Sequence, residues 1–98
     1  DGILLHYCFE DPRIVNSLIT YNKQTGLNLV GCHDIVVAAN QFEENQDALR
    51  CIDGFNLCMT GNNLDDHLGA EIGQEFEIAR DLIILKNIIG DRQTDMTL

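Results

Sequence analysis

Tryptophan is absent from this 98-residue chain, and proline and serine occur once each, as Pro12 and Ser17. A serine-nucleophile enzyme would therefore have only Ser17 to use. Basic side chains are also scarce, because 6 Lys and Arg stand against 16 Asp and Glu, giving a formal net charge of −10. Nucleic-acid backbones and anionic membranes are bound by clustered basic side chains. The composition therefore argues against both kinds of ligand.

Long apolar runs are missing as well. The longest, at 35–39 and 82–85, fall far below the roughly 18–20 residues of a membrane-spanning helix. The four cysteines are widely spaced and include no C-x-x-C pair; they are Cys8, Cys32, Cys51 and Cys58. We expect reduced, mostly buried thiols and hence a cytoplasmic or nuclear protein. Cysteine and histidine also lack the local spacing of a zinc finger.

The apolar residues recur at helical spacing along most of the chain. Asp11-Pro12 has the features of a helix N-cap followed by proline at the first helical position. Apolar positions follow at 14, 15, 18 and 19, and Gly26 suits a helix C-terminus. Strand signals are weak and show no convincing hairpin. The pattern predicts an all-α fold in a single domain over 1–98.

The chain also resembles itself at a nearly fixed offset. A Phe-Glu pair begins at positions 9, 42 and 76, where 42 − 9 = 33 and 76 − 42 = 34. His33 and His67 repeat this offset, because 67 − 33 = 34. The spacing predicts a helix–turn–helix unit repeated three times, over approximately 1–31, 32–65 and 66–98.

Several of these segments are similar to ankyrin repeats. Residues 1–6, Asp-Gly-Ile-Leu-Leu-His, resemble the family's Asp-Gly-x-Thr-Pro-Leu-His opening. Ile14-Val15 and Leu18-Ile19 look like its second-helix pattern, Ile-Val-x-x-Leu-Leu, although no unit contains the Thr-Pro dipeptide. The resemblance implies helix–turn–helix repeats stacked as a short ankyrin-like solenoid. A compact three- or four-helix bundle is the alternative.

Such a repeat domain would be a non-catalytic protein–protein interaction module. The resemblance implies that a partner binds the inter-repeat turns and the surface of the first helices, and the −10 charge favours a basic segment. The candidate partner-binding residues are His33, Asp34, Asn40, Gln41, Asn62, Asn63, Asp65, Asp66, His67 and Gln74. The alternative function is an acidic helical inhibitor that occupies a basic groove as a nucleic-acid mimic.

The remaining motifs predict no catalysis, cofactor or metal site. His33-Asp34 and Asp66-His67 each combine a base with a carboxylate, but neither has an obvious nucleophile nearby. The acidic pairs 43–44 and 65–66 lack the ligand register of a calcium loop, and no phosphate-binding glycine loop is present. The apolar stretch at 82–89 predicts a last helix with an uncovered face, through which the chain would self-associate.

Overall fold

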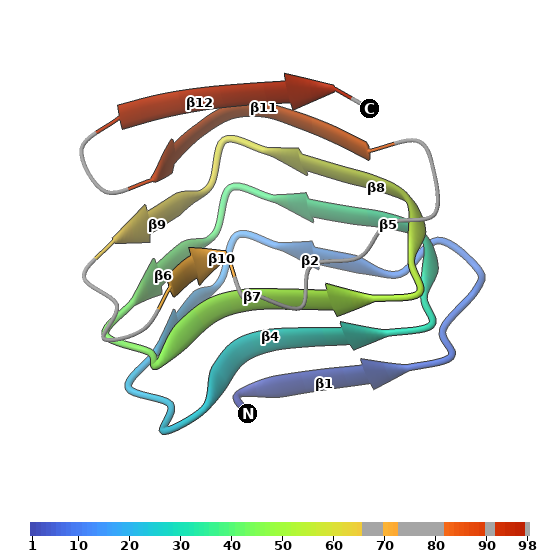
Figure 1. Cartoon of the computed structure of the whole chain (residues 1–98), viewed down its shortest axis with the longest axis horizontal. Coiled ribbons are helices and arrows are strands. Elements are labelled where there is room, and N and C mark those ends of the chain that lie inside the picture. The colour runs from blue at the N-terminus through green and yellow to red at the C-terminus, as the bar shows by residue number, and fades with distance from the viewer. Residues whose placement is uncertain (66–69, 73–81, 90–91, 98) are drawn as a thin grey trace.

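Short β-strands wind in successive coils through the computed structural model, which describes residues 1–65, 70–72, 82–89 and 92–97 (Figure 1). These residues contain no helix, and therefore none long and apolar enough to cross a membrane. Coil 1 holds β1 (Ile3–His6), β2 (Arg13–Val15) and β3 (Leu18–Thr20). Coil 2 holds β4 (Thr25–Val30), β5 (His33–Ala38) and β6 (Gln41–Glu43), and coil 3 holds β7 (Asp47–Ile52), β8 (Phe55–Thr60) and β9 (Asn63–Asp65).

Successive coils stack into three parallel walls. Wall 1 is β1-β4-β7 with β10 (Ala70–Ile72), wall 2 is β2-β5-β8, and wall 3 is β3-β6-β9. The long strand β11 (Leu82–Ile89) pairs in parallel with both β8 and β9 and so joins walls 2 and 3. β12 (Arg92–Thr97) pairs antiparallel with β11 and lies at the opposite end of the solenoid from β1 (Figure 1).

The coils have a structural repeat shorter than the offset seen in the sequence. Val36 pairs with Arg13 in coil 1 and with Cys58 in coil 3, where 36 − 13 = 23 and 58 − 36 = 22. Leu57 and Leu82 are paired at the slightly larger offset of 82 − 57 = 25. The longer offset between the Phe-Glu pairs therefore does not correspond to the stacking repeat.

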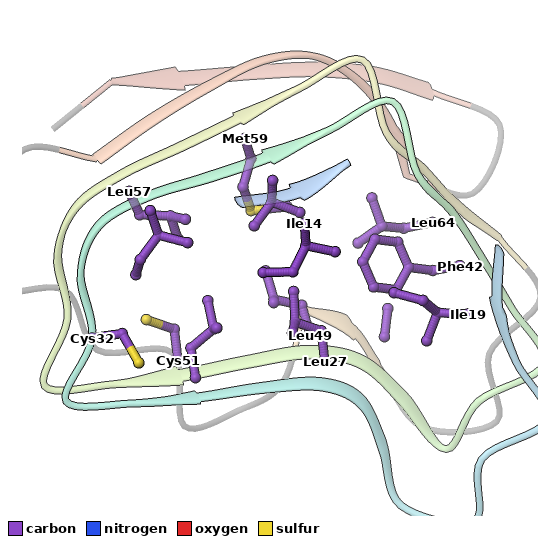
Figure 2. Packing of buried hydrophobic residues seen from close by; sticks show 14 residues of the cluster. Ile14, Ile19, Leu27, Cys32, Phe42, Leu49, Cys51, Leu57, Met59 and Leu64 are labelled. Atoms are coloured by element: carbon purple, nitrogen blue, oxygen red, sulfur yellow. The ribbon is translucent and has the colours of Figure 1, made fainter. Parts of the chain in front are cut away.

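The core lies inside the three walls, where apolar side chains from equivalent positions of successive coils stack on one another (Figure 2). Ile19, Phe42 and Leu64 are in register on wall 3, and all three are buried. Alternation along each strand directs every second side chain inward, as in β5, where Ile35 and Val37 are buried. Each wall therefore contributes only a few apolar side chains per coil.

Buried asparagines connect the coils at the corners. Between walls 2 and 3, Asn40 donates from Nδ2 to the Ile14 carbonyl at 2.8 Å and accepts from the Ser17 nitrogen at 3.0 Å. Between walls 3 and 1, Oδ1 of Asn45 accepts from the Asn22 backbone nitrogen at 3.1 Å, and Nδ2 of Asn45 donates to the Ile19 carbonyl at 3.0 Å. These amides satisfy backbone groups that leave the sheet hydrogen bonding where the chain turns.

Residues with positive φ occupy equivalent places at these corners. Asn16, Ala39 and Gly61 have φ of 54°, 56° and 65°. They immediately precede Ser17, Asn40 and Asn62, respectively. We call the hydrogen-bonded asparagines of these corners, Asn40 with Asn62 and Asn22 with Asn45, the ladder asparagines. A single left-handed residue changes the direction of the chain sharply between two extended segments. The repeated unit is thus a short strand, a left-handed residue and a polar corner residue.

The all-α prediction is wrong, and so are the ankyrin-like solenoid of helices and the helix bundle. Ile14 and Ile19 are both buried but belong to different walls, while Val15 and Leu18 between them are exposed. A bend after every few alternating residues thus produces spacings that resemble a helical period. Pro12 does not begin a helix: it precedes β2, at one end of its sheet, where a missing N–H is tolerated.

The apolar last helix is also wrong, because residues 82–89 form the strand β11. Leu82–Leu85 pair with β8, and Ile88 and Ile89 pair with β9. A continuous apolar run is equally compatible with a strand in a parallel sheet covered on both faces. Self-association through a C-terminal helix is therefore not supported.

Candidate functional site

The corner between walls 1 and 2 carries the most distinctive surface of the described chain. We define the first corner as residues 7–12 of coil 1, 31–34 of coil 2 and 53–56 of coil 3. Tyr7, Gly31 and Asp53 occupy equivalent positions there, and all have positive φ, at 56°, 64° and 53°. The corner is longest in coil 1, because β1 ends at His6 and β2 begins only at Arg13.

The Tyr7 ring lies directly against Gly31. A Cβ atom placed on Gly31 would lie 2.5 Å from Cδ1 and 2.6 Å from Cε1 of Tyr7, which is closer than real contacts allow. The positive φ favours glycine at position 31, and the space taken by the Tyr7 ring excludes a larger residue there. The ring remains 62% exposed although it is seated on the next coil.

A second aromatic pair extends the same surface. The Phe9 ring lies 4.7 Å from the His33 ring of coil 2, centroid to centroid, with 35° between the planes. Tyr7 and Phe9 are 6.3 Å apart, and His6 is 4.1 Å from Tyr7. We call Tyr7, Phe9 and His33 the aromatic ledge. Its two apolar rings are held by contacts with coil 2, yet both are large hydrophobic side chains left exposed to solvent.

Carboxylates border the aromatic ledge. Asp11 and Asp34 are equivalent residues of coils 1 and 2, and Asn56 follows in coil 3, with φ of 55°, 59° and 56°. Asn56 donates from Nδ2 to Oδ1 of Asp34 at 2.6 Å, which fixes that carboxylate on the outer surface. We call Asp11 and Asp34 the acidic column. Aspartate and asparagine suit these positions because they tolerate the left-handed conformation better than most residues.

Three thiols lie beneath the same corner. Cys32 is buried and donates from Sγ toward the Leu5 carbonyl at 3.3 Å, while Cys8 is half-buried and Cys51 is buried. Burial raises the pKa of Cys32, and the nearby Cys8 thiol adds to the increase. Burial raises the pKa of Cys51 to about 12, with a smaller contribution from Cys32. In Figure 2, Cys32 and Cys51 lie together at one end of the core.

The structure separates the residues that the sequence analysis grouped as partner-binding. His33 and Asp34 belong to the first corner. Gln41 and Asn63 are in register on wall 3, which does not border this corner, and Asp65 pairs there with Glu43. Asn40 and Asn62 are buried in the corner ladder. Asp66, His67 and Gln74 lie outside the described residues.

Sequence reasoning missed Tyr7, Phe9 and Asp11. A signal for them existed in the offsets between equivalent residues, because Gly31 follows Tyr7 by 31 − 7 = 24 and Asp34 follows Asp11 by 34 − 11 = 23. These spacings match the coil repeat rather than the offset between the Phe-Glu pairs. The described residues contain no group of three or more His, Cys, Asp or Glu side chains placed to hold a metal ion.

Comparison with known proteins adds no relative. No family model matches the sequence, and neither the curated proteins nor the solved structures contain a match to it. Membership of the ankyrin family therefore stays a prediction from the sequence, while the helical fold that it implied is wrong.

Proposed function

We propose that this chain is a non-catalytic protein-binding module, and that its first corner binds a basic segment of a partner protein. The observation that carries the proposal is the aromatic ledge beside the acidic column. Tyr7 and Phe9 are exposed by 62% and 49%, in a chain whose only Trp, Tyr or Phe residues are 4 Phe and 2 Tyr. Exposed aromatics held in fixed positions are typical of recognition surfaces.

The chemistry of the first corner favours a cationic group with a flat face. The negative face of an aromatic ring attracts a cation, and a guanidinium group also stacks on the ring. Asp11 lies two residues after Phe9 and Asp34 directly after His33, so a bound group at the rings would have carboxylate acceptors from the same corner. An arginine side chain can use both contacts, whereas a lysine ammonium lacks the planar stacking surface.

The overall charge favours the same class of partner. The −10 net charge attracts a basic segment over several ångströms, and it repels polyanions. Long-range attraction mainly accelerates association and weakens with added salt. Contacts with the aromatic rings depend less on salt, so they would retain part of the affinity when the charges are screened.

A labelled peptide provides the test. We expect an oligo-arginine peptide to bind the folded chain, in an anisotropy titration, more tightly than an oligo-lysine peptide of equal length. Both affinities fall with salt, but the arginine preference remains. Equal affinities for the two peptides would show general attraction to an acidic surface and would contradict recognition by the ledge.

Two matched pairs of variants locate the site. Tyr7→Ala removes the ring seated on Gly31, whereas Tyr21→Ala removes a tyrosine that is 76% exposed at a different corner. Asp34→Asn keeps an acceptor for Asn56, and Glu44→Gln makes the same charge change away from the first corner. We expect the first member of each pair to weaken arginine binding about tenfold, roughly 1.4 kcal/mol, and the second to leave it nearly unchanged. Equal effects within both pairs would place binding elsewhere.

A further inference from the structure

Two thiols of successive coils meet beneath the first corner. Pairing of β1 with β4 places His6 opposite Val30, and the Tyr7 nitrogen continues this register by donating to the Val30 carbonyl at 2.9 Å. Further along the corner, the His33 nitrogen donates to the Cys8 carbonyl at 3.0 Å. Cys8 and Cys32 are therefore held at equivalent positions of adjacent coils.

Equivalent positions just beyond two paired strands favour a disulfide, because such positions bring Cα atoms close together. Neighbouring strands of a sheet lie about 4.7–4.9 Å apart, and disulfide-bonded residues usually have Cα atoms about 4.4–6.8 Å apart. Both residues are reduced in this structure, and the Cys32 thiol is turned into the corner, toward the Leu5 carbonyl at 3.3 Å. The two side chains lie near enough for the Cys8 thiol to contribute to the raised pKa of Cys32.

The two thiols differ in access. Cys8 is half-buried and can be reached from solvent, whereas Cys32 is buried within the coil. Burial also raises the pKa of Cys32, which keeps it protonated and slow to react directly with an oxidant. The half-buried Cys8 thiol would therefore react first and the buried Cys32 thiol second, as in pairs that combine an attacking and a resolving cysteine.

We propose that Cys8 and Cys32 form an oxidation site, in which a low-molecular-weight disulfide such as oxidised glutathione links coil 1 to coil 2. The Cys8 thiolate attacks one glutathione sulfur, forming a mixed disulfide and releasing the first glutathione. Cys32 then attacks the Cys8 sulfur, and its proton goes to the second glutathione as that thiolate leaves. The protein loses two electrons and two protons, and one glutathione disulfide is reduced to two glutathione molecules.

Trypsin separates the relevant cysteines cleanly. Cleavage after Arg13, Lys23, Arg50 and Arg80 places Cys8 in peptide 1–13, Cys32 in peptide 24–50, and both Cys51 and Cys58 in peptide 51–80. The folded protein is incubated with oxidised glutathione, its free thiols are then blocked, and the non-reduced digest is analysed by mass spectrometry. We expect peptides 1–13 and 24–50 to be joined, with a combined mass lower by two hydrogens.

Half-buried Cys58 is the internal control, because it lies in wall 2 opposite Val36 and not in the first corner. It should carry at most a single glutathione. Cys32→Ser should leave Cys8 trapped as the mixed disulfide, and Cys8→Ser should leave Cys32 reduced. In wild type, a link between peptides 24–50 and 51–80, or separate glutathione adducts on Cys8 and Cys32, would overturn the proposal.

The oxidised protein supplies an independent readout that does not depend on any partner. A bond between coils 1 and 2 restricts the unfolded chain, so the urea midpoint of the oxidised wild type should rise and return after reduction. Cys8→Ser should show no such shift under identical treatment. An oxidised wild type that unfolds at the same urea concentration as the reduced form would contradict a bond formed within the native coil geometry.

Discussion

The side-chain oxygen of Asn62 accepts two hydrogen bonds from Asn40, one from its backbone nitrogen and one from Nδ2, each at 3.0 Å. Asn62 in turn donates to the Val37 carbonyl at 2.8 Å. Both residues are buried, so water does not compete for these groups. The hydrogen bonds between Asn40 and Asn62 therefore continue the pairing of coils 2 and 3 through the corner between walls 2 and 3. β5 and β8 end before this corner, and β6 and β9 begin after it.

Asn40→Ala should destabilise the fold strongly. The substitution leaves the Ser17 nitrogen and the Ile14 carbonyl without their partner, and it removes one donor to Asn62. Each buried polar group left unsatisfied costs about 1–3 kcal/mol, so we expect a loss of about 2–4 kcal/mol in the free energy of unfolding. Urea denaturation followed by circular dichroism measures it.

Gln41→Ala is the matched control for the asparagine ladder. It removes a neighbouring amide side chain that is half-buried and faces away from the core. We expect a change within about 0.5 kcal/mol, as for most surface substitutions. Equal losses for the two variants would mean that the Asn40 amide does not have the role assigned to it.

Ala39→Gly should stabilise the protein. Ala39 has φ of 56°, and a left-handed conformation costs a non-glycine residue about 1–2 kcal/mol. Added flexibility of the unfolded chain offsets about 0.4–1 kcal/mol of this gain. We expect a net increase of about 0.5–1 kcal/mol in the free energy of unfolding, measured as a higher urea midpoint.

The reverse change at the equivalent position completes this test. Gly61 has φ of 65°, and a Cβ atom there would meet nothing within 4 Å. Gly61→Ala should therefore lose about 1 kcal/mol through backbone strain alone. A destabilising Ala39→Gly together with a neutral Gly61→Ala would show that these corners are not left-handed in solution.

The sequence contains two periods, and only the shorter one corresponds to the stacking of the coils. The sequence does contain the coil repeat, because the ladder asparagines recur at it, with 62 − 40 = 22 for one pair and 45 − 22 = 23 for the other. Core residues follow it less visibly, since Ile19, Phe42 and Leu64 are apolar but not identical. The Phe-Glu pairs were more conspicuous, but they are not structurally equivalent: Phe42 is buried in the core, while Phe9 is exposed at the first corner.

Part of the candidate site was accessible from the sequence and part was not. The sequence predicts His33 and Asp34 on the surface of a turn between repeats, and in the structure they are the half-buried first two residues of β5, at the first corner. Tyr7 and Phe9 could not be placed beside them, because their contacts with Gly31 and His33 join two different coils. The acidic composition, by contrast, is independent of the fold, and the expected basic partner therefore remains a hypothesis after the change from helices to strands.

Gly31→Ala should cost more than Gly61→Ala, although both glycines have nearly the same φ. The added methyl group at position 31 also displaces the Tyr7 ring, which a Cβ would approach to 2.5 Å. We expect a loss of about 2–3 kcal/mol, combining left-handed strain with overpacking. In the Tyr7→Ala background the penalty should fall toward the value for Gly61→Ala. A penalty unchanged by removal of Tyr7 would show that the ring is not seated on Gly31.

Alkaline pH should unfold the protein partly through Cys51. Burial first, and the neighbouring Cys32 second, raise the pKa of Cys51 to about 12 from an ordinary value of 9.0. The native thiol therefore keeps its proton at a pH where the unfolded thiol loses it. The stabilisation is complete below pH 9 and disappears as pH rises toward 12, because the unfolded state binds fewer protons there. By about pH 10.5 we expect a loss of about 1–2 kcal/mol in the free energy of unfolding.

Urea titrations at a series of pH values, for wild type and Cys51→Ala, measure the contribution of Cys51. Tyrosines and lysines titrate in both proteins, so the informative quantity is the difference between the two slopes. Wild type should lose stability more steeply above pH 9, and parallel curves would mean that Cys51 is as accessible to water in the folded chain as in the unfolded one.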